Sequence, residues 1–424
     1  MKKYNQRVIL PLILSVVFIS HFSSKNVTSF DSRWSIPTAL SIIREGDISL
    51  DEYEKMIPAN DHRIEIIDGH IYSRFPAGVY VIAFPFVYIV DKLAAHRLLF
   101  NTDDLVKQST TDKMELFIAS IIIAITAIFI YLLACLFLNR KYSLLVTFIF
   151  AFCTPAWSTA SRALWQHGPS MLMLTITLYL ILLAGDKPRL IQFASIPLAF
   201  SYVVRPTNSI PVFLLSLFVL IQYKKYFFRY FIWAMSIAVP FLLFNFTIYH
   251  SCLSPYYLPQ RIGSNPHFFE ALAGNLVSPA RGLFIFSPIL LFAICGVVLK
   301  IENKQLSQLD YFLFGIIFLH WIAISSFRYW WAGHSFGPRF FSDLIPYFIY
   351  FLIPTMAGMS ELKDIRKVIF VSVFSCFILL SFFIHFRGAN NWDVYVWNVK
   401  PVNVDVKPAR VWDWKDIQFL RGIK

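Results

Sequence analysis

Eleven apolar runs follow one another along the chain and are separated by short polar or basic connections. A transmembrane helix needs about 20 apolar residues, with a range of about 17 to 25. Several runs are shorter than this range, so we expect some of the helices to be short or bent. The pattern predicts an all-α polytopic membrane protein with about 11 transmembrane helices, over residues 8–22, 116–138, 142–157, 169–184, 190–204, 210–223, 230–249, 283–299, 309–326, 340–356 and 368–386.

One further apolar run, over residues 77–90, contains Pro85. If it is left out of the count, basic clusters such as Arg140-Lys141 and Lys224-Lys225 lie on the same side as the basic N-terminus. By the positive-inside rule that side is the cytoplasm. A twelfth crossing would move these clusters outside, so we expect residues 77–90 to form a helix in the outer interface.

The resulting topology is N-in and C-out. It gives a transmembrane domain over residues 1–386 and an extracytoplasmic tail over residues 387–424. Within the domain, residues 23–115 form a long first extracytoplasmic loop with interfacial helices. Loops longer than about 12 to 15 residues are usually functional or disordered, and the helix-like apolar spacing of Ile36, Leu40 and Ile43 predicts a folded one.

Composition narrows the class of protein further. The chain of 424 residues is 57% apolar and only 15% charged, whereas soluble domains are about 25% charged, so a soluble protein is excluded. Disorder is excluded by the 18% aromatic content. The net charge of +13 comes from basic residues scattered between apolar runs, and a single patch for nucleic acid is missing. We therefore expect an inner or plasma membrane protein in contact with membrane lipids and with no nucleic-acid partner.

Candidate chemistry collects on the extracytoplasmic side, where polar and aromatic residues lie beside Gly and Pro. The sequence has no glycine-rich nucleotide loop, and a nucleotide is scarce outside the cell. The pair Asp103-Asp104 is the best candidate for a metal site, but its setting is typical of a solvated turn or helix cap. We expect no cofactor, no metal, and a lipid-borne substrate.

Two residues of the first loop carry the sharpest hypotheses. Asp31 lies just beyond the first apolar run, and partial desolvation there raises a carboxylate's basicity, as a general base requires. Its alternative role is to cap a helix over residues 32–44. Arg74 precedes Pro76 at the head of the interfacial helix, where a guanidinium binds phosphate oxygens bidentately. Its alternative role is snorkelling to lipid phosphate.

The number of other external basic residues at helix ends favours a bound anion, because topology alone depletes arginine on that side. We expect Asp31, Arg74, Arg281 and Arg339 to surround one cavity. Two simpler readings are an aromatic belt of Trp and Tyr at the interface and a local pair between Arg339 and Asp343. The substrate-binding candidates are Arg33, Arg74, His167, Arg205, Arg281, Arg328, His334 and Arg339.

At these positions the chain resembles the integral-membrane C-type glycosyltransferases (GT-C), the group that contains lipid A aminoarabinose transferase and the protein O-mannosyltransferases. The likeness covers the topology of most of the chain. Its local anchors are Asp31, the Gly46-Asp47 step about sixteen residues later, and Arg74 before Pro76. The segments SPARG at 278–282 and WWAGHSFGPRF at 330–340 accompany them.

The chain departs from the aminoarabinose transferase pattern in two places. That family has D-E-x-R-Y at the acidic site, whereas this chain has Asp31-Ser32-Arg33-Trp34, so Arg33 comes one position early. The family's basic residue is a lysine directly before the proline, whereas Phe75 separates Arg74 from Pro76 here.

The resemblance implies a membrane glycosyltransferase of glycan biosynthesis in the cell envelope. It would move a sugar from a polyprenyl-phosphate donor to an acceptor hydroxyl on the outer, periplasmic face, with inversion and with Asp31 as the general base. The acceptor would be a glycan, a lipid or a protein. Two alternatives remain open at this point, a polysaccharide polymerase or ligase and a non-enzymatic transporter or flippase for lipid-linked sugars.

Overall fold

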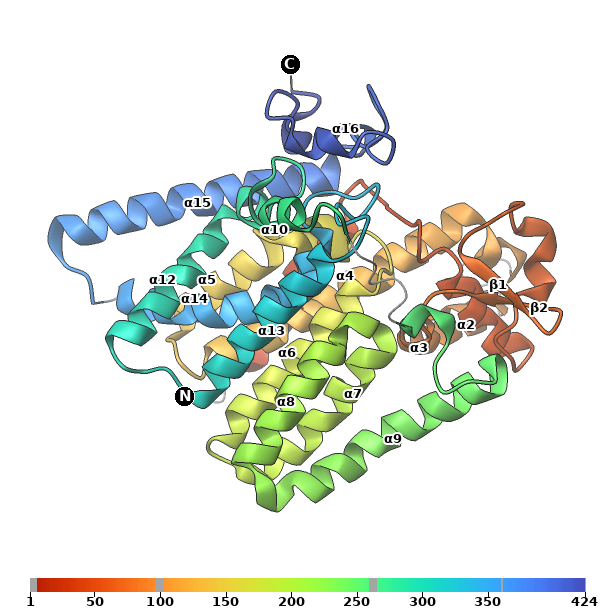
Figure 1. The fold of residues 1–424 in the computed structure, drawn as a ribbon, viewed down its shortest axis with the longest axis horizontal. Coiled ribbons are helices and arrows are strands. Elements are labelled where there is room, and N and C mark those ends of the chain that lie inside the picture. Colours follow the sequence, from red (N-terminus) through yellow and green to blue (C-terminus); the bar gives the residue numbers. More distant parts are fainter. Residues whose placement is uncertain (1–5, 96–101, 259–264, 360, 424) are drawn as a thin grey trace.

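The computed structural model describes residues 6–95, 102–258, 265–359 and 361–423, and nearly all of its regular structure is helical (Figure 1). The helices are α1 (Gln6–Phe22), α2 (Ser35–Arg44), α3 (Gly78–Ala95), α4 (Gln108–Ala134), α5 (Arg140–Phe152), α6 (His167–Ala184), α7 (Ser195–Val204), α8 (Ser209–Gln222), α9 (Lys224–Tyr249), α10 (Phe268–Val277), α11 (Leu283–Phe286), α12 (Leu291–Glu302), α13 (Gln308–Ser325), α14 (Ile345–Met359), α15 (Asp364–Asn390) and α16 (Asp393–Val396).

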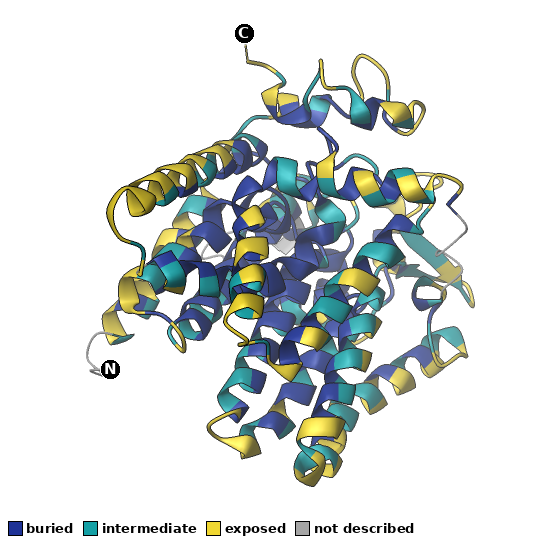
Figure 2. Cartoon of the chain, turned by 60° about the vertical axis from the view of Figure 1, so that its left-hand side comes forward, coloured by how far each residue is buried: buried dark blue, intermediate teal, exposed yellow. Residues whose placement is uncertain are grey.

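In the described part of the chain, six helices are long and apolar enough to cross a membrane. They are Gln108–Ala134, His167–Ala184, Lys224–Tyr249, Gln308–Ser325, Arg339–Met359 and Asp364–Asn390. In α9 and α15, only 11% and 22% of the most apolar stretch is buried, and Figure 2 shows the N-terminal part of α15 as largely exposed. The prediction of a mostly helical chain is confirmed. This apolar surface is unfavourable in water and favours a membrane protein, while the eleven spans and their direction stay predictions.

In two of the expected runs, a 3-10 segment that begins at a proline replaces part of the α-helix. The run over 283–299 is divided into α11 and α12 by a 3-10 turn, Pro288–Leu290. The run over 190–204 starts as a 3-10 helix, Pro188–Ala194, before α7 begins. Proline lacks the N–H that a helix interior needs and is favourable only in the first turn, so each segment begins at its proline.

The core is a bundle around α4, which packs against α1, α5 and α6. On the other side of the bundle α12 packs along α14, so closely that a β-carbon on Gly296 would lie 1.9 Å from the carbonyl oxygen of Phe351. Small residues permit such close approach between membrane helices. The bundle therefore fixes the helix ends from which the polar segments emerge.

The first loop is folded, as predicted, and contains one element that the all-α expectation omits. Strands β1 (Ile64–Ile67) and β2 (His70–Ser73) form an antiparallel hairpin. Its two turn residues, Asp68 and Gly69, have φ values of 53° and 87°, as a two-residue turn of type I′ requires. Helix α3 packs against α2 through a small apolar core of its own.

Residues 391–423 of the tail form a compact cap beside the C-terminal end of α15, seen in dark blue at the top of Figure 1. Buried Trp397 packs there with Trp330 and Trp331 of the connection after α13. Arg410 holds the cap together by donating hydrogen bonds to backbone carbonyl groups within it, including that of Val402 at 2.8 Å. The cap thus covers the connection between α13 and α14.

Candidate active site

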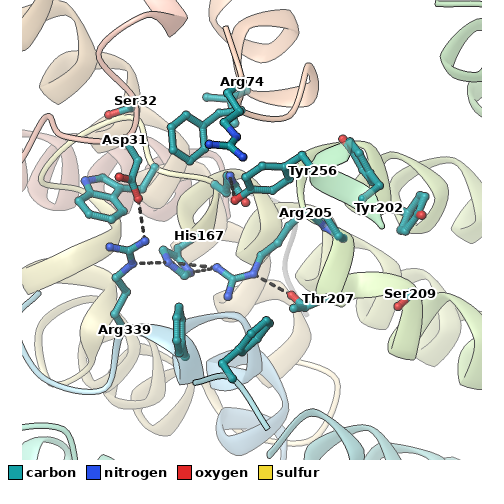
Figure 3. Close-up of a pocket in the computed structure, with 18 of the residues that line it drawn as sticks. Asp31, Ser32, Arg74, His167, Tyr202, Arg205, Thr207, Ser209, Tyr256 and Arg339 are labelled. Atoms are coloured by element: carbon teal, nitrogen blue, oxygen red, sulfur yellow. Dashed lines mark hydrogen bonds and ion pairs between the residues drawn. The ribbon is translucent and has the colours of Figure 1, made fainter. Parts of the chain in front are cut away.

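A cavity of about 790 Å³ lies between the first loop and the helix ends that face it (Figure 3). Its polar lining comes from the turn after α1, the connection from β2 to α3, the start of α6, the connection from α7 to α8, and the residues just before and at the end of the WWAGHSFGPRF motif. Six of the nine candidate residues lie on it: Asp31, Arg74, His167, Arg205, Arg328 and Arg339.

Asp31 forms an ion pair across the cavity. Its Oδ2 lies 2.8 Å from Nη2 of Arg339, and the guanidinium carbon lies 3.9 Å from the ring centre of Trp165. The capping hypothesis is wrong, because α2 begins at Ser35 and the residue before it, Trp34, makes no side-chain capping bond. The carboxylate of Asp31 is therefore free to face the cavity.

His167, the first residue of α6, lies between two arginines. Nε2 of its ring is 3.3 Å from Nε of Arg339 and 3.0 Å from Nη1 of Arg205, while Nδ1 lies 3.4 Å from Oδ1 of Asp343. Nη1 of Arg205 lies closer still to Nδ1, at 2.5 Å, and because guanidinium groups can only donate, the ring acts as an acceptor toward both arginines. His167 thus connects the two arginines.

Arg205 pairs with a different carboxylate from Arg339, that of Asp343. Its Nε lies 2.9 Å from Oδ2 of the fully buried Asp343 and donates to Thr207 at 2.8 Å. The backbone of Arg205 is extended, with φ −154° and ψ 122°, because Pro206 disfavours a helical residue before it. The sequence-based alternative that Asp343 pairs with Arg339 is wrong: Arg339 pairs with Asp31, and Asp343 pairs with Arg205.

The outer rim carries two further cations. Nε of Arg74 lies 3.1 Å from Oε1 of Glu65, and the Arg74 side chain is 39% exposed. Arg328 is exposed, and in the described part of the chain it forms no ion pair with a carboxylate. These two arginines face incoming solutes, whereas Arg205 and Arg339 lie deeper.

Aromatic side chains form another part of the cavity wall. The hydroxyl of Tyr256 accepts a hydrogen bond from Gln166 at 2.9 Å, and its ring packs edge-on against Phe75 at 5.5 Å. Tyr257 is fixed beside it by donating to the carbonyl of Val203 at 2.6 Å. Rings held in this way present flat apolar faces, which suit either a sugar ring or a lipid chain.

Neither a protein-family model nor a curated protein matches the chain. The geometry of the cavity is therefore the basis for the functional argument.

Three candidate residues lie outside the cavity, and for Arg281 the expectation that it shares the cavity with Asp31, Arg74 and Arg339 is wrong. Arg281 is fully buried beneath the tail, where it donates to five acceptors, among them Gln418 and Asn398 at 2.8 Å each. Burial lowers the pKa of Arg281 to about 9. His334 contacts Asn403 at 2.9 Å and Asp405 at 3.3 Å, both in the tail. Arg33 lies over the ring of Trp34 at 5.4 Å.

Sequence reasoning missed several residues around the cavity, notably Trp165 and Tyr256. Most of these are aromatic residues for which membrane-interface placement is the ordinary reading. Sequence reasoning also missed Glu115, which lies behind the cavity wall and contacts Ser32 and Leu164; an ionisable residue at the edge of an apolar run is a signal of function. Among the described residues, no group of three or more His, Cys, Asp or Glu side chains is placed to hold a metal ion.

Proposed function

We propose that the protein is a membrane glycosyltransferase that uses a polyprenyl-phosphate sugar as its donor. The proposal includes the N-in, C-out arrangement of about 11 transmembrane helices, which puts the cavity on the outer face of an inner or plasma membrane. The observation that carries the proposal is that Asp31, Arg74, Arg205, Arg328 and Arg339 line one cavity. A single carboxylate facing several guanidinium groups suits the transfer of a sugar away from a phosphate.

The reaction is an inverting displacement. The acceptor's hydroxyl oxygen forms a bond to the anomeric carbon while Asp31 takes the hydroxyl proton. The bond from the anomeric carbon to the phosphate oxygen breaks, and polyprenyl phosphate leaves with the electron pair. General-base assistance contributes about 10²- to 10⁴-fold to such a step.

The arginines act on the leaving group. Charge develops on the phosphate as the glycosidic bond breaks, and fixed cations stabilise that charge without having to reorganise. Arg339 is central, because the same guanidinium contacts Asp31. A phosphate that binds Arg339 competes for this ion pair and would release the carboxylate of Asp31 toward an acceptor hydroxyl. Donor binding thereby prepares Asp31 for its task.

The test uses purified protein and a panel of radiolabelled polyprenyl-monophosphate hexoses, with water or a membrane extract as the acceptor. Release of polyprenyl phosphate measures turnover. We expect Asp31→Asn to lose about 10²- to 10⁴-fold in turnover with donor binding retained, and Arg74→Ala to weaken donor binding. Arg366→Gln, a change at the exposed start of α15, serves as the control.

Three outcomes would reject the proposal. If Asp31→Asn turns over as well as the parent and Arg74→Ala binds donor normally, the cavity does not perform this reaction. Movement of intact donor across a vesicle membrane without cleavage would identify a transporter. A transfer that depends on the tail and not on Asp31 would identify a polysaccharide polymerase or ligase.

A further inference from the structure

Glu115 is a buried carboxylate that the proposed reaction does not use. It lies in the second turn of α4 and is fully buried. Burying a carboxylate costs several kcal/mol unless donors satisfy its oxygens. Charge-assisted hydrogen bonds are short and about twice as strong as neutral ones, so a site that keeps such a group holds its partners firmly.

The partners of Glu115 are the residues on either side of Asp31. The hydroxyl of Ser29 donates to Oε1 at 2.6 Å, and the hydroxyl of Ser32 donates to Oε2. Ser29 comes two residues before Asp31, and Ser32 follows it directly. The turn that carries Asp31 is therefore attached to α4 at both of its ends.

A third donor connects Glu115 to the opposite wall of the site. The backbone N–H of Leu164 donates to Oε2 at 3.0 Å. The next residue is Trp165, whose ring lies under the guanidinium of Arg339. One carboxylate thus fixes the segment that presents Asp31 and the segment that supports Arg339.

We infer that Glu115 is a positioning residue that sets the alignment of Asp31 with Arg339. This inference rests on the proposed function for its catalytic consequence, whereas the alignment itself can be measured without any substrate. Glutamine should replace Glu115 well: its oxygen can accept from Leu164 and Ser32, and its amide can donate to the Ser29 hydroxyl, which is also an acceptor. Alanine removes all three contacts.

The first experiment is a double-mutant cycle on the melting temperature of the purified protein. Asp31→Asn and Arg339→Gln are combined in the parent, in Glu115→Gln and in Glu115→Ala. We expect the two changes to be non-additive in the parent and in Glu115→Gln, as for residues in contact, and additive in Glu115→Ala. Equal non-additivity in Glu115→Ala would overturn the inference.

Asp310→Ala is the matched control for loss of a buried carboxylate. Asp310 is also fully buried, and it contacts Lys300 at 2.6 Å and Tyr350 at 3.0 Å, away from the cavity. Asp310→Ala should lower the melting temperature and leave the non-additivity of Asp31→Asn and Arg339→Gln unchanged. If Glu115→Ala does not fold, Ser29→Ala and Ser32→Ala remove one contact each, and their combination should weaken the non-additivity more than either alone.

The second experiment measures turnover of the same donor panel and binding of radiolabelled polyprenyl phosphate. Glu115→Ala should lower turnover at least tenfold with unchanged polyprenyl-phosphate affinity, and Glu115→Gln should restore turnover. If Glu115→Gln is as inactive as Asp31→Asn, the charge of Glu115 takes part in the reaction and the positioning role is wrong. If the parent itself shows no turnover, the proposed function fails while the melting cycle still tests the alignment.

Discussion

The Oδ2 atom of Asp31 lies 2.8 Å from Nη2 of Arg339, although 308 positions separate the two residues in the sequence. The pair joins the turn after α1 to the segment that leads into α14. It places the candidate base and a candidate phosphate ligand in direct contact.

Two substitutions of Arg339 should distinguish the contribution of its charge to turnover from that of its planar, forked shape. We expect Arg339→Gln to lower turnover by about 10²- to 10³-fold, as for removal of one stabiliser of developing charge. Arg339→Lys should lower it less, because lysine keeps the charge but loses the planar fork. Turnover and polyprenyl-phosphate binding, measured for the parent, Arg339→Lys and Arg339→Gln, check this ranking of activity. Equal activity in all three proteins would remove Arg339 from the mechanism.

Variants of the buried pair Arg205 and Asp343 should separate an effect on the melting temperature from an effect on polyprenyl-phosphate binding. Breaking a buried pair from one side costs about 3 to 5 kcal/mol, whereas replacing both partners with apolar residues is often neutral. We expect Asp343→Asn to lower the melting temperature strongly and the combination Arg205→Met with Asp343→Leu to recover it. Polyprenyl-phosphate binding should stay weak in the double variant. Normal binding there would exclude Arg205 as a ligand.

Arg281 should prove structural. Its side chain satisfies carbonyl and amide oxygens from the tail and from the segment after α13. Leaving such acceptors unsatisfied costs about 1 to 3 kcal/mol each, so Arg281→Gln should lower the melting temperature markedly. Polyprenyl-phosphate affinity should not change. A selective loss of affinity at normal stability would return Arg281 to the list of ligands.

The first loop should lose stability in acid through Asp61. Burial pushes the pKa of Asp61 upward, but hydrogen bonds from Arg63 at 2.6 Å and 2.7 Å and from Trp34 at 3.0 Å outweigh it and lower the pKa. A depressed folded-state pKa adds stability above the unfolded value of about 3.9, and this stability disappears as the pH falls through the folded value. The melting-temperature gap between the parent and Asp61→Asn should therefore be constant above about pH 5 and narrow below about pH 4. A gap that does not vary with pH would contradict this.

A native thiol can test the topology. Cys252 is exposed in the connection between α9 and α10, which the N-in, C-out arrangement puts outside. A membrane-impermeant maleimide should label it in intact cells, and Cys252→Ser should abolish that label. Gln305→Cys in the Cys252→Ser background should react only in opened cells. The reverse pattern would reject the arrangement.

Much of the fold could be predicted because long apolar runs have few structural solutions in a bilayer. The hairpin of β1 and β2 was missed although its Asp68-Gly69 pair is a strong local turn signal. The candidate site was harder to predict from the sequence than the fold. Asp31, Arg74, His167, Arg205, Arg328 and Arg339 could be selected as polar residues at external helix ends, but their partners depend on packing between distant segments. For this reason a local pairing of Arg339 with Asp343 looked plausible and was wrong.

The ion pairs described above also bear on which anions the cavity admits. Arg74, Arg205 and Arg339 each already face a carboxylate: Glu65, Asp343 and Asp31. A small anion such as inorganic phosphate would have to displace these carboxylates with electrostatic attraction alone, and salt screens that attraction near the surface. A phosphate attached to a long hydrocarbon brings apolar burial of about 0.8 kcal/mol per methylene group. If the cavity binds a phosphate as proposed, this internal neutralisation should favour lipid-anchored phosphates over the free ion.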